Sequence, residues 1–469
     1  MSEAIDLPTQ EVLEGAGEDA GGLGGHPAGL TTLFFTEMWE RFSYYGMRAI
    51  LVLYMVAPVA QGGLGFDTKQ AASIYGTYTM SVYLTALPGG LIADRWLGAR
   101  LAVLLGGIVI ACGHFTMVFR STNFLYAGMA LIAIGTGLLK PNISAMVGGL
   151  YRENDTRRDS GFSLFYMGIN VGAVMAPLVC GYLAQSEGFK SFLASSGFDP
   201  AGSWHWGFGA AGIGMTLGLV VFLLQRGRLR QAERRMEKFA REDEATASSD
   251  KSLTSGDWKR IAVIFVFFLF TILFWAAYEQ KGASLNLFAA KLVNTEVFGY
   301  AFPSSWLQSL TPLYVIMLAP LFSILWVRMG DRQPSSPAKF TLGLLFIGLA
   351  YLLFMVPAAW MTADGKVSPL WLVGLYFLEV VGEMCLSPVG LSTVTKLSPL
   401  KLVGIMMGVW FLASSLGSKL AGYLSGFFVA DSPATLVRLY GGIAVGLLVA
   451  TAILAALIPT LRRMMGHVR

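Results

Sequence analysis

Twelve apolar segments, each long enough to cross a lipid bilayer, run through this chain of 469 residues. A membrane-spanning helix needs about 20 mainly apolar residues, and only helices or closed barrels can cross, because no water is present to bond free backbone groups. The segments lie near residues 30–57, 70–93, 101–119, 122–149, 160–184, 205–225, 258–290, 303–327, 338–360, 369–395, 401–429 and 434–461. We therefore predict an all-α integral membrane protein with twelve transmembrane helices in two bundles of six.

Composition supports this class of protein and excludes others. Only 13% of the residues are charged, whereas soluble domains carry about 25%. The three cysteines, Cys112, Cys180 and Cys385, all lie in apolar segments, and three cysteines cannot build a disulfide framework. A soluble enzyme, a disordered chain and a disulfide-linked scaffold are therefore excluded.

The polar stretches divide the chain into five parts. Residues 1–29 are expected to form a disordered acidic tail, residues 30–225 the first bundle, 226–257 a cytoplasmic linker, 258–461 the second bundle and 462–469 a cytoplasmic C-terminal tail. The linker contains no apolar run that could cross a bilayer, so no extra helix pair is expected between spans 6 and 7. Its basic and acidic residues alternate, which is typical of a solvated connector rather than of a nucleic-acid site.

The distribution of basic residues predicts the orientation in the membrane. Loops after even-numbered spans, together with the C-terminus, hold 23 Lys and Arg, and loops after odd-numbered spans hold six. Cytoplasmic loops carry the excess of basic residues. Both termini are therefore expected in the cytoplasm.

Ionisable side chains occur inside the predicted spans. Each costs roughly 2.5–3.5 kcal/mol at the centre of a membrane helix, so together they must pair with one another or face an aqueous cavity. These residues are Glu37, Glu40, Arg41, Arg48, Lys140, Glu279, Lys281, Glu379, Glu383 and Lys419. The pattern predicts a polar cavity between the two bundles.

Span 1 carries the densest group. At about 100° per residue, Glu37, Arg41, Tyr44 and Arg48 share one face, with Glu40 at its edge. An arginine keeps a neighbouring carboxylate ionised, so separating the two favours protonation. The face could serve only as a structural ion-pair cluster, but it also meets the physical requirement of proton-driven transport, which we favour.

Outside span 1, Lys140 lies in the first half, and the acids Glu379 and Glu383 lie opposite in the second. Lys140 precedes Pro141 in a glycine-rich span and is expected to face a cavity, although a lysine can also extend towards the interface. Glu379 and Glu383 are one helical turn apart and share a face.

Four stretches resemble the proton-dependent oligopeptide transporter family of the major facilitator superfamily. Glu37-Met-Trp-Glu40-Arg41-Phe42-Ser43-Tyr44-Tyr45 is similar to its span 1 signature, and Lys140-Pro141-Asn142 to its span 4 motif. Residues 165–177 and 382–390 are similar to its span 5 and span 10 motifs. Residues 90–100 also resemble the superfamily's loop motif, and the resemblance extends from about residue 30 to residue 430.

The resemblance implies a major facilitator fold and symport of di- and tripeptides with protons. It implies that Arg48 and Lys140 hold the peptide carboxylate and that Glu383 holds the amino terminus. The other implied pocket residues are Asn170, Tyr44, Tyr45, Tyr83, Trp275, Trp410 and Ser414. The implied proton-coupling residues are Glu37, Glu40, Arg41, Lys140 and Glu279.

The same resemblance favours a bacterial inner-membrane protein that works as a monomer. No cofactor is expected besides the co-transported proton. The four histidines are scattered and show no metal-ligand spacing. Glu379, Lys281 and Lys419 have no role implied by the family.

A short peptide is a zwitterion whose charged ends lie roughly 7–10 Å apart, at 3.3–3.6 Å per residue. Cations in one bundle and an acid in the other could therefore hold both ends. We expect that protonation of span 1 or of Glu279 releases Arg41 or Lys140 and lets the bundles move. A proton-coupled carrier of another anion such as nitrate, and a peptide sensor that does not transport, remain alternatives.

Overall fold

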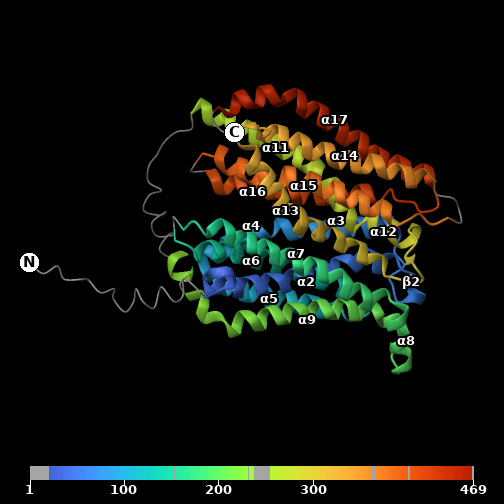
Figure 1. Cartoon of the computed structure of the whole chain (residues 1–469). Helices are drawn as coiled ribbons and strands as arrows, with labels where there is room; N and C mark the ends of the chain where they lie inside the picture. The colour runs from blue at the N-terminus through green and yellow to red at the C-terminus, as the bar shows by residue number, and fades with distance from the viewer. Residues whose placement is uncertain are drawn as a thin grey trace, which may run out of the picture.

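The computed structural model describes residues 21–152, 155–230, 232–236, 254–360, 365–399 and 402–466. Its long helices form two bundles that lie side by side (Figure 1). The N-terminal half contains α2 (Ala28–Val56), α3 (Thr68–Leu84), α4 (Ala86–Ile92), α5 (Ala99–Thr116), α6 (Thr122–Gly149), α7 (Arg158–Gln185) and α9 (Ser203–Leu224). The C-terminal half contains α11 (Ser255–Tyr278), α12 (Ser284–Leu292), α13 (Leu310–Met329), α14 (Ser336–Trp360), α15 (Leu370–Leu397), α16 (Val403–Ser425) and α17 (Pro433–Met465).

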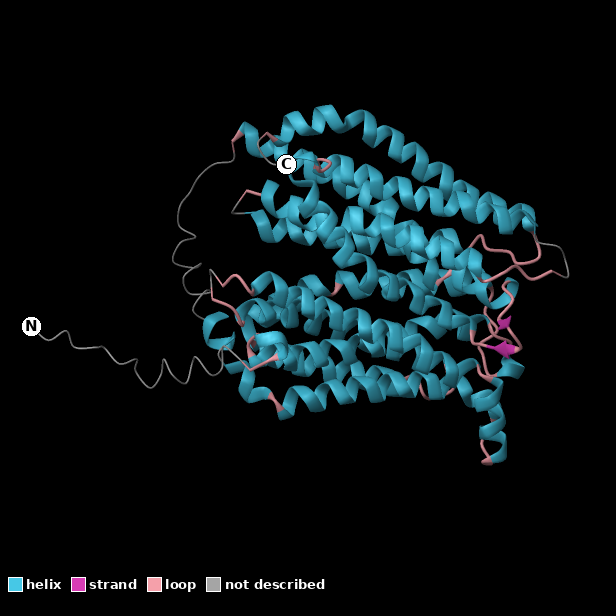
Figure 2. Ribbon diagram, in the orientation of Figure 1, coloured by secondary structure: helices cyan, strands magenta, loops and turns pink. Residues whose placement is uncertain are grey.

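Shorter elements connect or extend these helices. They are η1 (Leu23–Gly25), η2 (Val59–Gln61), η3 (Ala93–Leu97), α8 (Glu187–Ser195), η4 (Pro200–Gly202), η5 (Arg226–Leu229), η6 (Glu279–Gly282), η7 (Ser304–Ser309) and η8 (Gly330–Arg332). A two-stranded antiparallel hairpin, β1 (Glu296–Val297) and β2 (Tyr300–Ala301), follows α12 (Figure 2). Its turn includes Gly299 at φ 81°, a conformation that glycine adopts without steric cost. The sequence analysis did not predict this hairpin.

The all-helical architecture and the two sets of six spans are confirmed within the described residues. Ten stretches there are long and apolar enough to cross a membrane on composition alone. The other two predicted spans are α2, which carries four charged residues, and α3 with α4, which the helix break at Thr85 divides. The charges of α2 and the break in span 2 therefore explain why composition alone finds ten.

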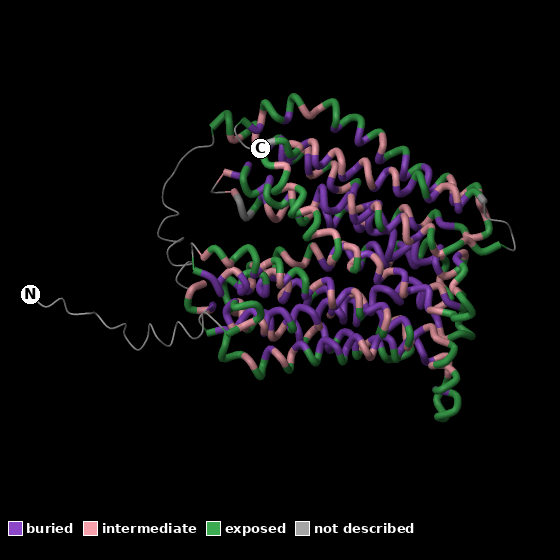
Figure 3. Tube along the Cα trace, in the orientation of Figure 1, coloured by how far each residue is buried: buried purple, intermediate pink, exposed green. Residues whose placement is uncertain are grey.

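Burial follows the expectation for helices surrounded by lipid. Buried residues lie inside the bundles, and many exposed ones lie on their outer faces (Figure 3). Many large apolar side chains are exposed, including Leu224, Val327 and Ile213. In a bilayer, hydrocarbon chains cover such exposed apolar side chains.

The two terminal tails differ from expectation where the structure describes them. Residues 1–20, 237–253 and 467–469 lie outside the described residues. Residues 21–29, expected in the disordered tail, instead form η1 and the start of α2, and the ring of His26 bonds to the Tyr151 hydroxyl at 2.9 Å. At the other end, α17 continues to Met465.

The linker is also partly structured. Residues 226–229 form η5, and Arg100 pairs with Glu233 at 3.0 Å. Thr254 and Asp257 cap the start of α11 reciprocally. The expected absence of an extra helix pair concerns residues 237–253, which lie outside the described residues, so it stays a prediction.

The two halves are bonded to each other near the end opposite the start of α2. Asn286 of α12 donates to the Ala49 carbonyl at 2.8 Å. Trp306 of η7 donates to the Leu178 carbonyl at 3.0 Å, and Ser309 donates to the Val174 carbonyl at 2.7 Å. These bonds join α2 and α7 to the C-terminal half at this end of the molecule.

The helix pair α3–α16 brings the halves into backbone contact. A Cβ atom added at Gly76 would lie 2.8 Å from the Gly422 Cα, and one added at Gly422 would lie 2.6 Å from the Gly76 Cα. Small residues permit such close helix approach within membranes. No larger side chain fits between these two helices as they stand.

We predict that Gly422→Leu destabilises this arrangement, because overpacking of a close contact costs typically 1–3 kcal/mol. The apparent Tm of the purified protein in detergent should fall by several degrees. Gly442→Leu is the matched control, since a Cβ at Gly442 meets no heavy atom within 4 Å. Equal melting temperatures for the two variants would contradict the close contact.

Candidate functional site

The charged face of α2 forms a buried cluster of its own. Arg41 Nε lies 3.2 Å from Glu37 Oε1, one turn away, and also contacts the Glu40 carboxylate. The Arg41 guanidinium lies 5.2 Å from the centre of the Tyr44 ring, within range of a cation–π contact. Among the described residues, Glu37 Oε2 and Glu40 Oε1 have no hydrogen-bond partner. Two carboxylates thus share one guanidinium in a site that water scarcely reaches.

A second ion pair joins the two halves. Arg48 of α2 pairs through Nη2 with Glu279 of η6, and its Nε donates to the Tyr75 hydroxyl of α3. Arg48 and Glu279 are each only 3% exposed. Taking two charges out of water costs several kcal/mol per ion, and removing one partner leaves the other buried and uncompensated. The contact therefore binds the halves only while both groups are charged.

The backbone of η6 makes this approach possible. The helix of span 7 is interrupted at Glu279–Gly282 by a short 3-10 turn, η6, between α11 and α12. A Cβ at Gly282 would lie 3.1 Å from Arg48 Nε and would overlap the Tyr75 hydroxyl. Glycine at this position thus lets the turn lie against the Arg48 side chain.

The C-terminal half supplies the opposing acid. The Tyr278 hydroxyl donates a hydrogen bond to the carboxylate of Glu383 in α15. Lys281 Nζ lies 3.2 Å from the centre of the Tyr278 ring. Lys281 interacts electrostatically with both Glu383 and Glu379. This lysine therefore places a cation beside the acids of the second half.

Glu379 has a different environment from Glu383. It is completely buried, and neither of its carboxylate oxygens has a hydrogen-bond partner among the described residues. It does not line the central cavity, whereas Glu383 does. The two glutamates were predicted to share one helix face. In the structure, Glu383 lines the cavity, whereas Glu379 is buried in the interior.

A cavity of about 480 Å³ lies between the halves, within the usual range of small-molecule sites, about 300–1,000 Å³. Charged side chains from both halves line it. They are Glu37, Arg41, Arg48 and Lys140 from the first half, and Glu279, Lys281 and Glu383 from the second. Lys140 Nζ lies 4.7 Å from the centre of the Tyr83 ring. The cavity thus has cations and acids on both walls, with Lys140 and Glu383 facing it from opposite halves.

The structure places most of the predicted site residues on this cavity. The other predicted residues that line it are Asn170, Tyr45, Tyr83, Trp275, Trp410 and Ser414. Glu40 and Tyr44 do not: Glu40 is fully buried beside Arg41, and the Tyr44 ring lies under the Arg41 and Arg48 guanidinium groups. Their contact with the cavity is therefore indirect.

The sequence analysis did not assign several lining residues. They include Tyr166, Tyr278, Lys281, Gln308, Ser387 and Phe411. Tyr166 was detectable, because it lies one turn before Asn170 in the span 5 motif and its carbonyl accepts from the Asn170 amide at 2.9 Å. Gln308 was not, since it belongs to a short turn outside any motif.

The structure also corrects the expected partner of Glu279. The expectation was that this glutamate controls Arg41 or Lys140. The carboxylate instead pairs with Arg48, while Arg41 pairs with Glu37 and Glu40. The two ion-pair systems of the cavity are thus separate: one lies within α2 and the other crosses between the halves.

Comparisons with known proteins identify relatives over most of the chain. The model of the POT family matches residues 100–246 and 242–439. A peptide transporter of Yersinia enterocolitica, YePEPT, is 37% identical over 94% of this chain and 96% of its own length. A di-/tripeptide transporter of Lactococcus lactis is 35% identical over 95% of this chain and 98% of its own length.

A solved structure shows the same arrangement. The crystal structure of a variant of the peptide transporter POT in complex with alafosfalin superposes with a TM-score of 0.85, at 38% identity, and covers 98% of this chain and 100% of that chain. The likeness confirms the predicted major facilitator fold with its twelve-helix core. By the family model, the relatives and the fold, this chain is a membrane protein that belongs to the POT family of transporters.

Proposed function

We propose that this protein carries di- and tripeptides into the cell together with protons, by alternating access of the central cavity. The observation that carries the proposal is that Arg48 and Lys140 of one half and Glu383 of the other line the same cavity. A peptide zwitterion with ends roughly 7–10 Å apart can meet both signs of charge there. The relatives that transport peptides support the same substrate class.

The ion pair between Arg48 and Glu279 supplies the coupling in this proposal. A peptide carboxylate that binds Arg48 competes with the Glu279 carboxylate for the same guanidinium. Once released, Glu279 is a buried carboxylate without a partner, which favours uptake of a proton. The pair across the halves is then broken, and the halves are free to separate at that point.

The cluster on α2 supports a second proton-holding step. Glu37 and Glu40 share Arg41, so that cluster carries one more negative than positive charge when ionised. A proton on either carboxylate balances it. Entry of protons down the membrane potential yields about 2.3 kcal/mol per charge per 100 mV, which is the energy source we propose.

We further propose a bacterial inner-membrane location, with both termini in the cytoplasm and the monomer as the working unit. The excess of basic residues in loops after even-numbered spans supports this orientation. In it, the end at which α12 and η7 bond to α2 and α7 is extracellular. The cycle uses no cofactor besides the co-transported proton.

We predict that Glu279→Gln abolishes proton-driven accumulation of di-alanine in proteoliposomes, because the amide cannot take up the proton. Counterflow exchange at equal pH should persist, since it does not need net proton movement. Glu296→Gln, at an exposed glutamate of β1, is the matched control and should behave like wild type. Unchanged accumulation by Glu279→Gln would remove this residue from the coupling.

We predict that Lys140→Ala and Arg48→Ala each weaken di-alanine binding at least tenfold, or about 1.4 kcal/mol. Binding is measured on the purified protein by calorimetry, and competition by tripeptides, free amino acids and nitrate defines the substrate. Lys291→Ala, at an exposed lysine of α12, is the control.

Arg48→Ala also removes the cation that pairs with Glu279. The Tm of this variant is therefore measured together with its affinity. Arg48→Lys keeps the charge but loses the planar set of donors that reaches both Glu279 and Tyr75, and it should fall between wild type and alanine. Wild-type affinity in both alanine variants contradicts the carboxylate clamp. Binding of nitrate alone would replace the peptide proposal with an anion carrier.

A further inference from the structure

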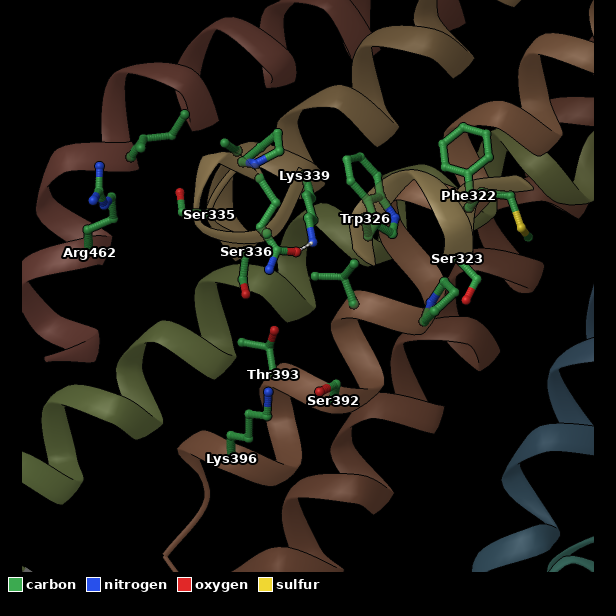
Figure 4. Close-up of a pocket in the computed structure, with 18 of the residues that line it drawn as sticks. Phe322, Ser323, Trp326, Ser335, Ser336, Lys339, Ser392, Thr393, Lys396 and Arg462 are labelled. Carbon is green, nitrogen blue, oxygen red and sulfur yellow. Dashed lines mark hydrogen bonds between the residues drawn. The ribbon is translucent and has the colours of Figure 1, made fainter. Parts of the chain in front are cut away.

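A second large cavity lies in the C-terminal half, and residues of that half alone line it. Its volume is about 760 Å³, and residues of α13, η8, α14, α15 and α17 line it. Figure 4 shows side chains from these helices around one space, with Lys339, Lys396 and Arg462 among them. It lies towards the end at which α13, α15 and α17 finish and α14 begins.

The charged side chains known to line this cavity are all basic. Lys339, Lys396 and Arg462 line it, and none of the lining side chains that the structure describes is acidic. Over the same described residues, no carboxylate forms an ion pair with any of the three within 4.0 Å. Among the described side chains, none that lines the cavity carries a negative charge to balance these three cations.

Lys339 is the most buried of the three cations that line the cavity, and it is only 8% exposed. Its Nζ donates to Gln333 Oε1 at 2.8 Å and lies 4.4 Å from the centre of the Trp326 ring. Both partners are neutral. Burying a charge is costly unless an opposite charge accompanies it, so an anion in the cavity would stabilise this ammonium.

Neutral hydrogen-bond donors supplement the cations. Hydroxyl groups of Ser335, Ser336, Ser392 and Thr393 line the cavity. The 25-residue helix α14 begins at Ser336, and the positive end of a helix dipole attracts anions. Lysine, arginine, hydroxyls and a helix start together form the usual set of phosphate-binding groups.

We propose that this cavity binds a phosphate-bearing anion, from either the headgroup of an anionic phospholipid or free phosphate. In the orientation proposed above, the cavity lies at the cytoplasmic side, where basic pockets between transmembrane helices bind anionic headgroups. Phe322 and Trp326 add an apolar wall beside the cations.

Helix α15 links this cavity to the central cavity. Met384 and Pro388 of α15 line both cavities, and Met384 directly follows Glu383. A ligand that bridges α13, α14, α15 and α17 therefore fixes the segment that carries the acid of the central cavity. We expect bound phosphate to stabilise the C-terminal half.

The test is a titration of the full-length purified protein in detergent, followed by its Tm. The probes are inorganic phosphate and dioctanoyl-phosphatidylglycerol, with sodium chloride at matched ionic strength and dioctanoyl-phosphatidylcholine as controls. We expect a saturable rise in Tm with at least one phosphate probe that exceeds its control. Saturation by inorganic phosphate identifies free phosphate as sufficient, whereas saturation by phosphatidylglycerol alone identifies the lipid headgroup.

The variant Lys339→Gln/Lys396→Gln/Arg462→Gln should weaken the apparent affinity for the effective probe at least tenfold. The matched control, Lys291→Gln/Arg438→Gln, removes cations outside the cavity and should keep the wild-type response. If the triple variant does not fold, Arg462→Gln alone, at an exposed side chain, should still lower the affinity. No saturable response to either probe, or an equal response in the cavity variants, overturns the proposal.

Discussion

The ion pair between Arg48 and Glu279 is the interaction on which the arrangement of the two halves depends. It joins α2 to the 3-10 turn η6 at a position that is almost inaccessible to water. Such a pair is strong only while both groups are charged, and breaking it leaves a large uncompensated cost. A single proton or a single competing carboxylate can therefore change the contact between two bundles of six helices.

The rest of the fold positions this pair and limits what its loss can change. Bonds from α12 and η7 to α2 and α7, and the backbone contact between Gly76 and Gly422, hold the halves together near the same end. Gly282 lets η6 lie against the Arg48 side chain. The charges of the central cavity are thus set between rigid helices, so that changes of charge act on helix packing rather than on flexible loops.

The sequence carried enough information for the fold and for most of the cavity wall. Apolar run length sets the spans, and helical periodicity places Glu37, Arg41 and Arg48 on one face, because both depend only on local geometry. The partner of Glu279 could not be derived in this way, since the contact joins residues 231 positions apart. Periodicity also placed Tyr44 and Glu40 on the charged face but could not show that neighbouring side chains cover them. The cavity around Lys339 forms only where four helices come together. No local pattern in the sequence therefore predicts it.

The central claim is that peptide binding at Arg48 releases Glu279 to take up a proton. The direct measurement is calorimetric binding of di-alanine in buffers of different ionisation enthalpy, which reports the protons exchanged on binding. We predict net proton uptake on binding by the wild-type protein and a loss of that uptake in Glu279→Gln. Binding without proton uptake in the wild type, or equal uptake in both proteins, would contradict the account.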